Sequence, residues 1–277
     1  MEQRVNDALH QRIKYAKITL QRHSIKKTQM KVLAVSNHKG GVGKTTSTVN
    51  IGAALSKKGF KVLLIDLDPQ ANLSQSLNVS QSSLTIYDYI KNPKNIMPVQ
   101  VRTGLFVIPS SLDLSAAEVE ISSEPGREYI VKEIISNLGT KFDFILIDCP
   151  PSLSVLTINA FTAANFVIIP MQAEYLPLRG LAKLTEVISK IKARLNPHLE
   201  IGCVFLTKFD NRKILNRDIA ESVKGFFGDK LLKTYISTSI ALAEAPSQGM
   251  DIFMYSHTSK PANEYDKLTA EVLEKIS

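Results

Sequence analysis

The sequence contains few cysteines and no long apolar run, and both absences narrow the classes of protein to which it can belong. Its 277 residues include two cysteines, Cys149 and Cys203, which are far apart and form no C-x-x-C pair. We therefore expect neither a disulfide framework nor a zinc site, and a reducing compartment suits the chain. No apolar run approaches the roughly 18 residues of a membrane span. The charged N-terminus also lacks the apolar stretch of a secretion signal. We expect a cytoplasmic protein with no membrane partner.

Positive charge is unevenly distributed along the chain. The formal net charge is +8, from 34 basic and 26 acidic residues. Residues 1–31 account for +6 of it, since they hold two acidic residues and eight basic ones, namely Arg4, Arg12, Lys14, Lys17, Arg22, Lys26, Lys27 and Lys31. Such an arm raises affinity for nucleic acid or an anionic membrane, unless it only makes the chain more soluble.

Apolar residues in the same arm follow a helical spacing. Val5, Leu9, Ile13, Ala16 and Leu20 form one stripe on a possible helix of about twenty residues. The stripe would pack on the chain's own core or on a dimer mate, because an interfacial membrane helix usually carries bulkier apolar residues. We divide the chain into a basic helical arm, residues 1–30, and a single domain, residues 31–277.

Short, β-rich apolar runs alternate with helical patterns along this domain. The runs are nearly all apolar, which indicates strands covered on both faces, as in a parallel sheet. Expected strands are 31–37, 61–68, 105–110, 142–148, 165–170 and 201–207, and expected helices are 44–57, 127–138, 155–163, 177–195, 213–227, 240–248 and 261–276. The polar stretch 79–103 is interpreted as an excursion with a short helix. The order predicts an α/β fold: a doubly wound, mostly parallel sheet flanked by helices, with ligands at the carboxyl ends of its strands.

The stretch "NHKGGVGKTT" (37–46) is close to a phosphate-binding loop. It departs from G-x-x-x-x-G-K-[ST] at the first position, where His38 replaces glycine. Its three glycines would let the backbone approach phosphate oxygens, and the helix that follows adds unpaired N–H groups and a positive dipole end. Lys44 would reach the β- and γ-phosphates, and the Thr45 hydroxyl would coordinate Mg²⁺. The motif predicts a site for ATP and Mg²⁺ lined by Lys39, Gly40, Gly41, Val42, Gly43, Lys44, Thr45 and Thr46.

Two further strands end in carboxylates. The expected strand in "FDFILIDCPP" ends in Asp148, where a Walker B carboxylate would hold Mg²⁺, commonly through water. The expected strand in "VLLIDLDPQAN" ends in Asp66 and Asp68. These two side chains point to the same face of the strand and toward the edge where the phosphates should lie. A carboxylate at that edge can orient an attacking water. Singly, each aspartate is also a common turn former.

In their order and spacing, these segments resemble the deviant Walker A class of P-loop NTPases, and specifically the ParA/Soj branch of plasmid and chromosome partition ATPases. Further resembling segments are "VIIPMQAEYLPLRGL", "LTKFDNR" and "LAEAPSQGMDIFMY", so the resemblance covers roughly residues 31–277. It implies an ATPase for DNA segregation, cytoplasmic and nucleoid-associated. It also implies a homodimer that forms on ATP binding and holds non-specific DNA, and a ParB-like centromere-binding partner protein.

The resemblance assigns roles to single residues. An extra lysine, matched here by Lys39, reaches across a nucleotide-sandwich dimer to phosphates bound by the other subunit. Its charge can stabilise the transferring phosphate as an arginine finger does. Asp68 would position the hydrolytic water, so the expected catalytic set is Lys39, Lys44 and Asp68. Asp66 would support Mg²⁺ or its hydration shell, beside Thr45 and Asp148.

A base-binding region is also implied. Thr207, Lys208 and Asp210 resemble the base-recognition loop of the family. The segment 237–246 is expected to close over the adenine, but it has Ser237-Thr238 where the family pattern has a Pro-Arg-like pair. The adenine contacts there are not assigned.

Basic residues gather on two of the expected helices. In the helix 177–195, five apolar residues fall within about 80° of one another at roughly 100° per residue, namely Leu181, Leu184, Ile188, Ile191 and Leu195. Four basic residues, Arg179, Lys183, Lys190 and Arg194, cluster on the opposite side. A single such charge usually marks only a solvated face. As a set they fit phosphate contacts that carry no sequence preference and weaken with salt. The expected DNA surface comprises Arg179, Lys183, Lys190, Arg194, Arg212, Lys213, Arg217 and Lys224.

Other functions on the same fold stay open. A membrane positioner resembling MinD would end in a basic amphipathic helix, whereas "NEYDKLTAEVLEKIS" carries balanced charges. A relative that positions protein cargo would keep the same site and DNA surface. A small-molecule ligase or kinase would need a substrate pocket that the sequence does not identify. A redox protein resembling nitrogenase iron protein would need cluster-ligating cysteines, which Cys149 and Cys203 do not provide.

Overall fold

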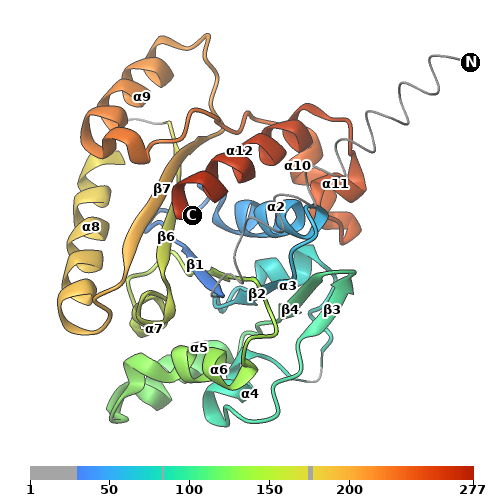
Figure 1. Cartoon of the computed structure of the whole chain (residues 1–277), viewed down its shortest axis with the longest axis vertical. Helices are drawn as coiled ribbons and strands as arrows, with labels where there is room; N and C mark the ends of the chain where they lie inside the picture. The colour runs from blue at the N-terminus through green and yellow to red at the C-terminus, as the bar shows by residue number, and fades with distance from the viewer. Residues whose placement is uncertain (1–29, 83, 174–176) are drawn as a thin grey trace, which may run out of the picture.

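The core of the molecule is a seven-stranded sheet. The computed structural model describes residues 30–82, 84–173 and 177–277, so the expected arm and its apolar stripe lie outside the described residues. The strands are β1 (Lys31–Val35), β2 (Val62–Asp66), β3 (Val99–Arg102), β4 (Leu105–Ile108), β5 (Phe144–Asp148), β6 (Phe166–Gln172) and β7 (Glu200–Thr207). Their order is β3-β4-β2-β5-β1-β6-β7, and only β3 pairs antiparallel with its neighbour. The prediction of a doubly wound, mostly parallel sheet is confirmed (Figure 1).

Helices cover both faces of this sheet (Figure 1). One face packs against α2 (Lys44–Lys57), α11 (Ile252–Tyr255) and α12 (Lys260–Ile276), and the other against α6 (Ile130–Leu138), α7 (Val155–Ala163), α8 (Pro177–Arg194) and α9 (Ile214–Phe227). Shorter helices are α3 (Asn72–Ser76), α4 (Ile86–Lys91), α5 (Leu114–Glu120) and α10 (Ile240–Glu244). Because both faces are covered, β2 and β5 are buried at every position, which accounts for their uniformly apolar sequences.

The elements match the expected ones closely, with local differences. Helices α2 and α7 have the expected bounds. The 240–248 segment is α10 followed by a 3-10 turn at Ala245–Gln248, where Pro246 cannot continue the hydrogen-bonding pattern. The 79–103 excursion does carry a short helix, α4, but it also contributes β3 at the edge of the sheet. The half-exposed β3 lacks the apolar run that marks the central strands.

Two helical glycines differ sharply in their surroundings, and this yields a stability prediction. A Cβ added at Gly52 in α2 would lie 2.5 Å from Leu64 Cδ2, and Leu64 is fully buried, whereas a Cβ at Gly225 in α9 would meet nothing within 4 Å. Gly52→Ala should therefore lower the free energy of unfolding by about 1–3 kcal/mol through overpacking. Gly225→Ala, the matched control, should raise it by up to about 1 kcal/mol, because alanine is the better helix former. Urea denaturation of both variants checks this, and equal effects of the same sign would contradict it.

Candidate nucleotide site

Sheet register brings the predicted acidic residues together. Strand β5 lies between β1 and β2, and Asp148 pairs with Val35 on one side and with Asp66 on the other. The carboxyl ends of β1, β2 and β5 therefore meet at one edge of the sheet. The glycine-rich loop between β1 and α2 starts from this same edge.

The loop has the conformation that glycine permits. Gly41 and Gly43 have φ values of 72° and 87°, in the left-handed region that other residues rarely adopt. At Gly40 and Gly41 an added Cβ would meet nothing within 4 Å, so their backbone faces open space. Such a loop, placed before the N-terminus of α2, offers N–H groups to an anion. The loop therefore fits a nucleotide phosphate chain.

The loop is held from behind by residues of β6 and β7. The Thr207 hydroxyl lies 2.8 Å from the Val42 carbonyl oxygen and 3.2 Å from that of Met171. The Asn37 side chain donates to the Pro170 carbonyl at 2.8 Å and accepts from the Lys39 N–H at 3.1 Å. Asn37 was not singled out in the sequence, since its role depends on the neighbouring strand β6. These contacts fix the loop against the sheet.

The two lysines of the loop occupy different environments. Lys44 is 7% exposed, and its Nζ donates to the Lys39 carbonyl oxygen at 3.1 Å. Desolvation lowers the pKa of Lys44, while the negative charge of Asp148 opposes that shift. Lys39 is exposed. One lysine thus lies inside the site and the other at its outer surface.

Three lysines place positive charge near His38, at the start of the phosphate loop. The pKa of His38 is lowered by desolvation first, and then by the charges of Lys183, Lys44 and Lys39. Lys183 belongs to α8, so the basic face of that helix lies within electrostatic reach of the phosphate loop. An anionic ligand would be attracted to this region.

Asp148 is the buried carboxylate nearest to the loop threonines. It is 1% exposed, and its Oδ2 accepts from the Thr45 hydroxyl at 2.7 Å. The Thr48 hydroxyl lies 3.3 Å from Oδ1. Desolvation and the nearby Asp66 raise the pKa of Asp148, and the hydrogen bond from Thr45 opposes the shift. Thr45 and Asp148 are therefore the pair best placed to hold a cation that neutralises this carboxylate.

Asp66 has protein partners for both its oxygens. Its Oδ2 accepts from the Ser74 N–H at 2.9 Å and from the Ser74 hydroxyl at 2.6 Å, and its Oδ1 accepts from the Asp68 N–H at 3.3 Å. Desolvation raises the pKa of Asp66, and the hydrogen bonds from Ser74 oppose the shift. Ser74 also accepts from the Ser110 N–H at 2.8 Å, which links the ends of β2 and β4. No sequence signal marked Ser74, because its partners come from separate strands.

Asp68 lies in the turn after β2. It is 7% exposed, and its Oδ1 accepts from the Gln70 N–H at 3.0 Å. Its backbone carbonyl accepts from the Ala71 N–H at 2.9 Å, and Ala71 has a φ of 54°. The turn holds the carboxylate at the same edge as Lys44. Its role in positioning water stays a prediction.

The residues expected to recognise the base follow the end of β7 and differ in their surroundings. Thr207 is buried behind the phosphate loop, Lys208 is exposed with a φ of 50°, and Asp210 forms an ion pair with Arg212 at 2.9 Å. Hydrogen bonds from Arg212 hold the pKa of Asp210 low, at about 2. Ser237 is held by Glu264 of α12 through its N–H at 2.9 Å. Their contacts with a base remain predictions.

The expected DNA surface spreads over α8, α9 and the residues just before α9, and Figure 1 shows α9 above α8 at the left of the molecule. Lys183, Lys190, Arg194, Arg212, Lys213, Arg217 and Lys224 are all exposed. Arg179 lies in α8, but its side chain is outside the described residues. Two of the charges have acidic partners, because Lys190 pairs with Glu186 at 2.6 Å and Arg212 with Asp210. Their role in binding DNA stays a prediction.

This geometry defines the class to which the protein belongs: a P-loop nucleotide-binding protein. The sequence profile of a family described as "AAA domain" matches residues 30–201. The chromosome-partitioning ATPase Soj of Treponema pallidum is 44% identical over 246 residues, 88% of this chain and 97% of that protein. The sporulation initiation inhibitor protein Soj of Bacillus subtilis is 40% identical over 247 residues, 87% of this chain and 98% of that protein. The chain belongs to the ParA/Soj family of partition ATPases, as the resemblance predicted.

Solved structures share the fold and carry nucleotides. A putative plasmid partition protein from Borrelia burgdorferi bound to AMPPNP has a TM-score of 0.78 and 27% identity, and covers 90% of this chain and 100% of its own. A Mycobacterium smegmatis protein described as cobyrinic acid a,c-diamide synthase, with bound ADP and magnesium, has a TM-score of 0.78 and 34% identity, and covers 89% and 95%. Within the part of this chain that the structure describes, none of the helices is long and apolar enough to cross a membrane.

The buried pair Asp66 and Asp148 predicts a pH effect on stability. The unfolded chain releases their protons near pH 4, whereas the folded chain holds them to higher pH, since the pKa of both is raised. The native state then binds more protons than the unfolded state, so stability falls as pH rises above about 4. In EDTA and without nucleotide, the wild type should lose at least about 1 kcal/mol relative to Asp148→Asn between about pH 5 and about pH 8. Thermal melts check this, and a constant difference would contradict it.

Proposed function

We propose that this chain is a ParA-type ATPase that drives segregation of DNA. The observation that carries the proposal is the pair of lysines in one phosphate loop, Lys44 buried inside it and Lys39 exposed at its outer surface, in a member of the ParA/Soj family. A buried lysine serves the phosphates of its own subunit. The exposed Lys39 would serve the phosphates bound by the other subunit of a dimer.

Each protomer would hold Mg·ATP with the loop 39–46, Thr45 and Asp148. Over the described ranges, no three His, Cys, Asp or Glu side chains cluster as metal ligands do. A Mg²⁺ ion would therefore combine these two residues with phosphate and water oxygens, as Mg²⁺ commonly does. The bound Mg·ATP supplies the phosphoric anhydride that is hydrolysed. Asp68 would orient the attacking water, while Lys44 and the partner's copy of Lys39 would stabilise the negative charge.

Hydrolysis would control contact with DNA. Two protomers close face to face on ATP, and the closed dimer presents the exposed basic residues of α8 and α9 to the phosphate backbone. Loss of the γ-phosphate removes what Lys39 binds across the interface, so the dimer opens and leaves the DNA. A ParB-like centromere-binding protein would accelerate this step, in the cytoplasm and on the nucleoid.

Dimer formation tests the role of Lys39. Lys39→Ala should bind ATP as a monomer but lose ATP-dependent dimers, whereas Lys44→Ala should lose nucleotide binding altogether. Lys141→Ala, which removes an exposed lysine elsewhere, is the matched control. Analytical ultracentrifugation with a non-hydrolysable ATP analogue measures the outcome. Normal dimers in Lys39→Ala would remove the cross-subunit role.

Turnover tests the role of Asp68. Asp68→Ala should bind ATP and dimerise, but hydrolyse ATP slower by about 100-fold or more, the usual contribution of a positioned base. It should also persist on DNA, because the step that opens the dimer is blocked. Single-turnover hydrolysis assays measure the rate. An unchanged rate would remove this assignment.

DNA binding tests the proposed function. It is measured by fluorescence anisotropy of a random-sequence duplex, with ATP, ADP or no nucleotide, at two salt concentrations. Binding should require ATP and weaken steeply with salt. The double variant Lys213→Ala/Arg217→Ala should reduce the salt slope by about 2, and Lys94→Ala/Lys141→Ala should leave it unchanged. Binding that ignores nucleotide, or none, would refute the proposal. It would favour a MinD-like ATPase acting on membrane, or a small-molecule ligase or kinase. A cargo-positioning ATPase acting on protein cargo would keep this DNA binding, so a positive result leaves that alternative open.

A further inference from the structure

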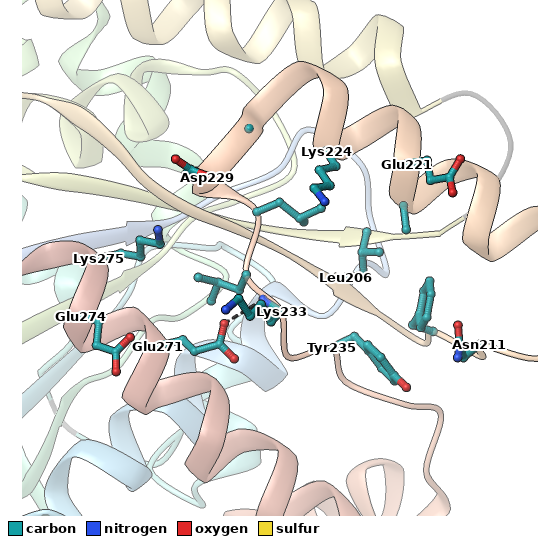
Figure 2. Close-up of a pocket in the computed structure, with 15 residues that line it drawn as sticks. Leu206, Asn211, Glu221, Lys224, Asp229, Lys233, Tyr235, Glu271, Glu274 and Lys275 are labelled. Carbon is teal, nitrogen blue, oxygen red and sulfur yellow. Dashed lines mark hydrogen bonds between the residues drawn. The ribbon is translucent and has the colours of Figure 1, made fainter.

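A cavity of about 710 Å³ lies between α9 and α12, away from the phosphate loop. Figure 2 shows α9 on one side with Lys224 and Glu221, and α12 on the other with Glu271, Glu274 and Lys275. Apolar and aromatic side chains from β7 and the segments after β7 and α9 line the rest of it, namely Leu206, Phe209, Leu231, Leu232 and Tyr235. We call this cavity the α9–α12 pocket. Its size is typical of a binding site.

Charges at the rim of the α9–α12 pocket have few partners. Glu221, Asp229 and Glu274 are exposed, and none of them forms an ion pair or side-chain hydrogen bond within the described ranges. Glu271 differs, because it accepts from the N–H groups of Lys233 at 2.7 Å and Thr234 at 3.0 Å. Lys224, Lys233 and Lys275 also line the pocket. An occupant with an apolar face and flanking cations would satisfy the floor and the three rim carboxylates together.

The chain itself enters the fold beside this pocket. Met30 packs against the core, and Lys31 Nζ donates to the carbonyl oxygen of Ile276 at the end of α12. Glu274 and Lys275, which line the pocket, precede Ile276 directly. Residues 21–29 can span up to about 30 Å when extended. A helix over residues 1–20 would be about 30 Å long.

We propose that the N-terminal arm docks as an amphipathic helix in the α9–α12 pocket of its own chain. The apolar stripe, residues 5, 9, 13, 16 and 20, would cover the apolar lining. At 100° per residue, Arg12 and Lys17 fall just outside the two margins of that stripe, where they can meet the rim carboxylates. The matched family profile begins at residue 30, so the arm lies outside the part that the family shares.

Docking on the same chain is favoured over docking on a second copy. The arm is tethered at Lys31, next to the end of α12, and a short tether gives an effective concentration in the millimolar range. A second copy at micromolar concentration competes poorly with that. The docked arm, residues 1–30, would also place its net charge of +5 beside the exposed basic residues of α9.

Hydrogen exchange of the full chain tests the docking. Leu9→Ser/Ile13→Ser removes two residues from the centre of the stripe, and Gln3→Ser/Gln11→Ser, the matched control, changes two polar positions outside it. Amides in 221–235 and 268–276 should exchange at least about tenfold faster in the first variant than in the wild type, and at the wild-type rate in the control. Equal exchange in all three proteins would overturn the proposal.

Cysteine cross-linking shows whose pocket is occupied. Cys149 and Cys203 are fully buried, and desolvation raises the pKa of both thiols, so neither competes. Under mild oxidation at low protein concentration, Ile13→Cys/Lys233→Cys should form an intramolecular disulfide in much higher yield than Gln11→Cys/Lys233→Cys. Disulfide-linked dimers would assign the pocket to a second copy. Equal disulfide yields from the two variants would mean that the arm contacts the α9–α12 pocket only by chance. Either result would overturn docking on the same chain.

Discussion

The arrangement of the site depends on two carboxylates that are buried side by side at the end of a parallel sheet. Asp66 and Asp148 are in register on adjacent strands, and both are almost inaccessible to water. Burying like charges together is unfavourable unless other groups compensate. Ser74 compensates Asp66 with two hydrogen bonds, while Thr45 and the buried Lys44 lie near Asp148. The compensation of Asp148 is incomplete, and a divalent cation bound there would complete it.

At this edge of the sheet, each neighbouring strand contributes a different part of the site. Strand β1 leads into the phosphate loop, β5 ends in the carboxylate beside it, and β2 ends in the turn that holds Asp68. Behind the loop, β6 and β7 supply the carbonyl of Pro170 and the hydroxyl of Thr207. The contacts of Pro170 and Thr207 with the loop join residues more than 100 positions apart in sequence. The loop therefore keeps its shape only while the whole central sheet is intact.

Local patterns made the fold and the centre of the site predictable. Uniformly apolar strands and well-marked helices such as α2 and α7 have strong periodic signals, and the loop 39–46 has a distinctive spacing of glycines and lysines. What sequence reasoning missed depends on tertiary contacts. Asn37 and Ser74 act through strands far along the chain, and Thr207 packs behind the loop because β7 ends beside Gly43. Strand β3 was missed because an antiparallel edge strand needs no apolar run.

The segment after α9 has a consequence for how copies of this protein can assemble. Leu232 and Ile236 donate their N–H groups to the carbonyl oxygens of Val204 and Leu206, and Phe209 donates to the carbonyl oxygen of Ile236. Much of the outer edge of β7 is thereby occupied by the chain's own backbone, and Glu264 and Glu271 of α12 hold that segment in place. A bare strand edge invites pairing with another chain and aggregation. With that edge capped, self-association on this side has to proceed through helices and side chains, which ordinary solution conditions can reverse.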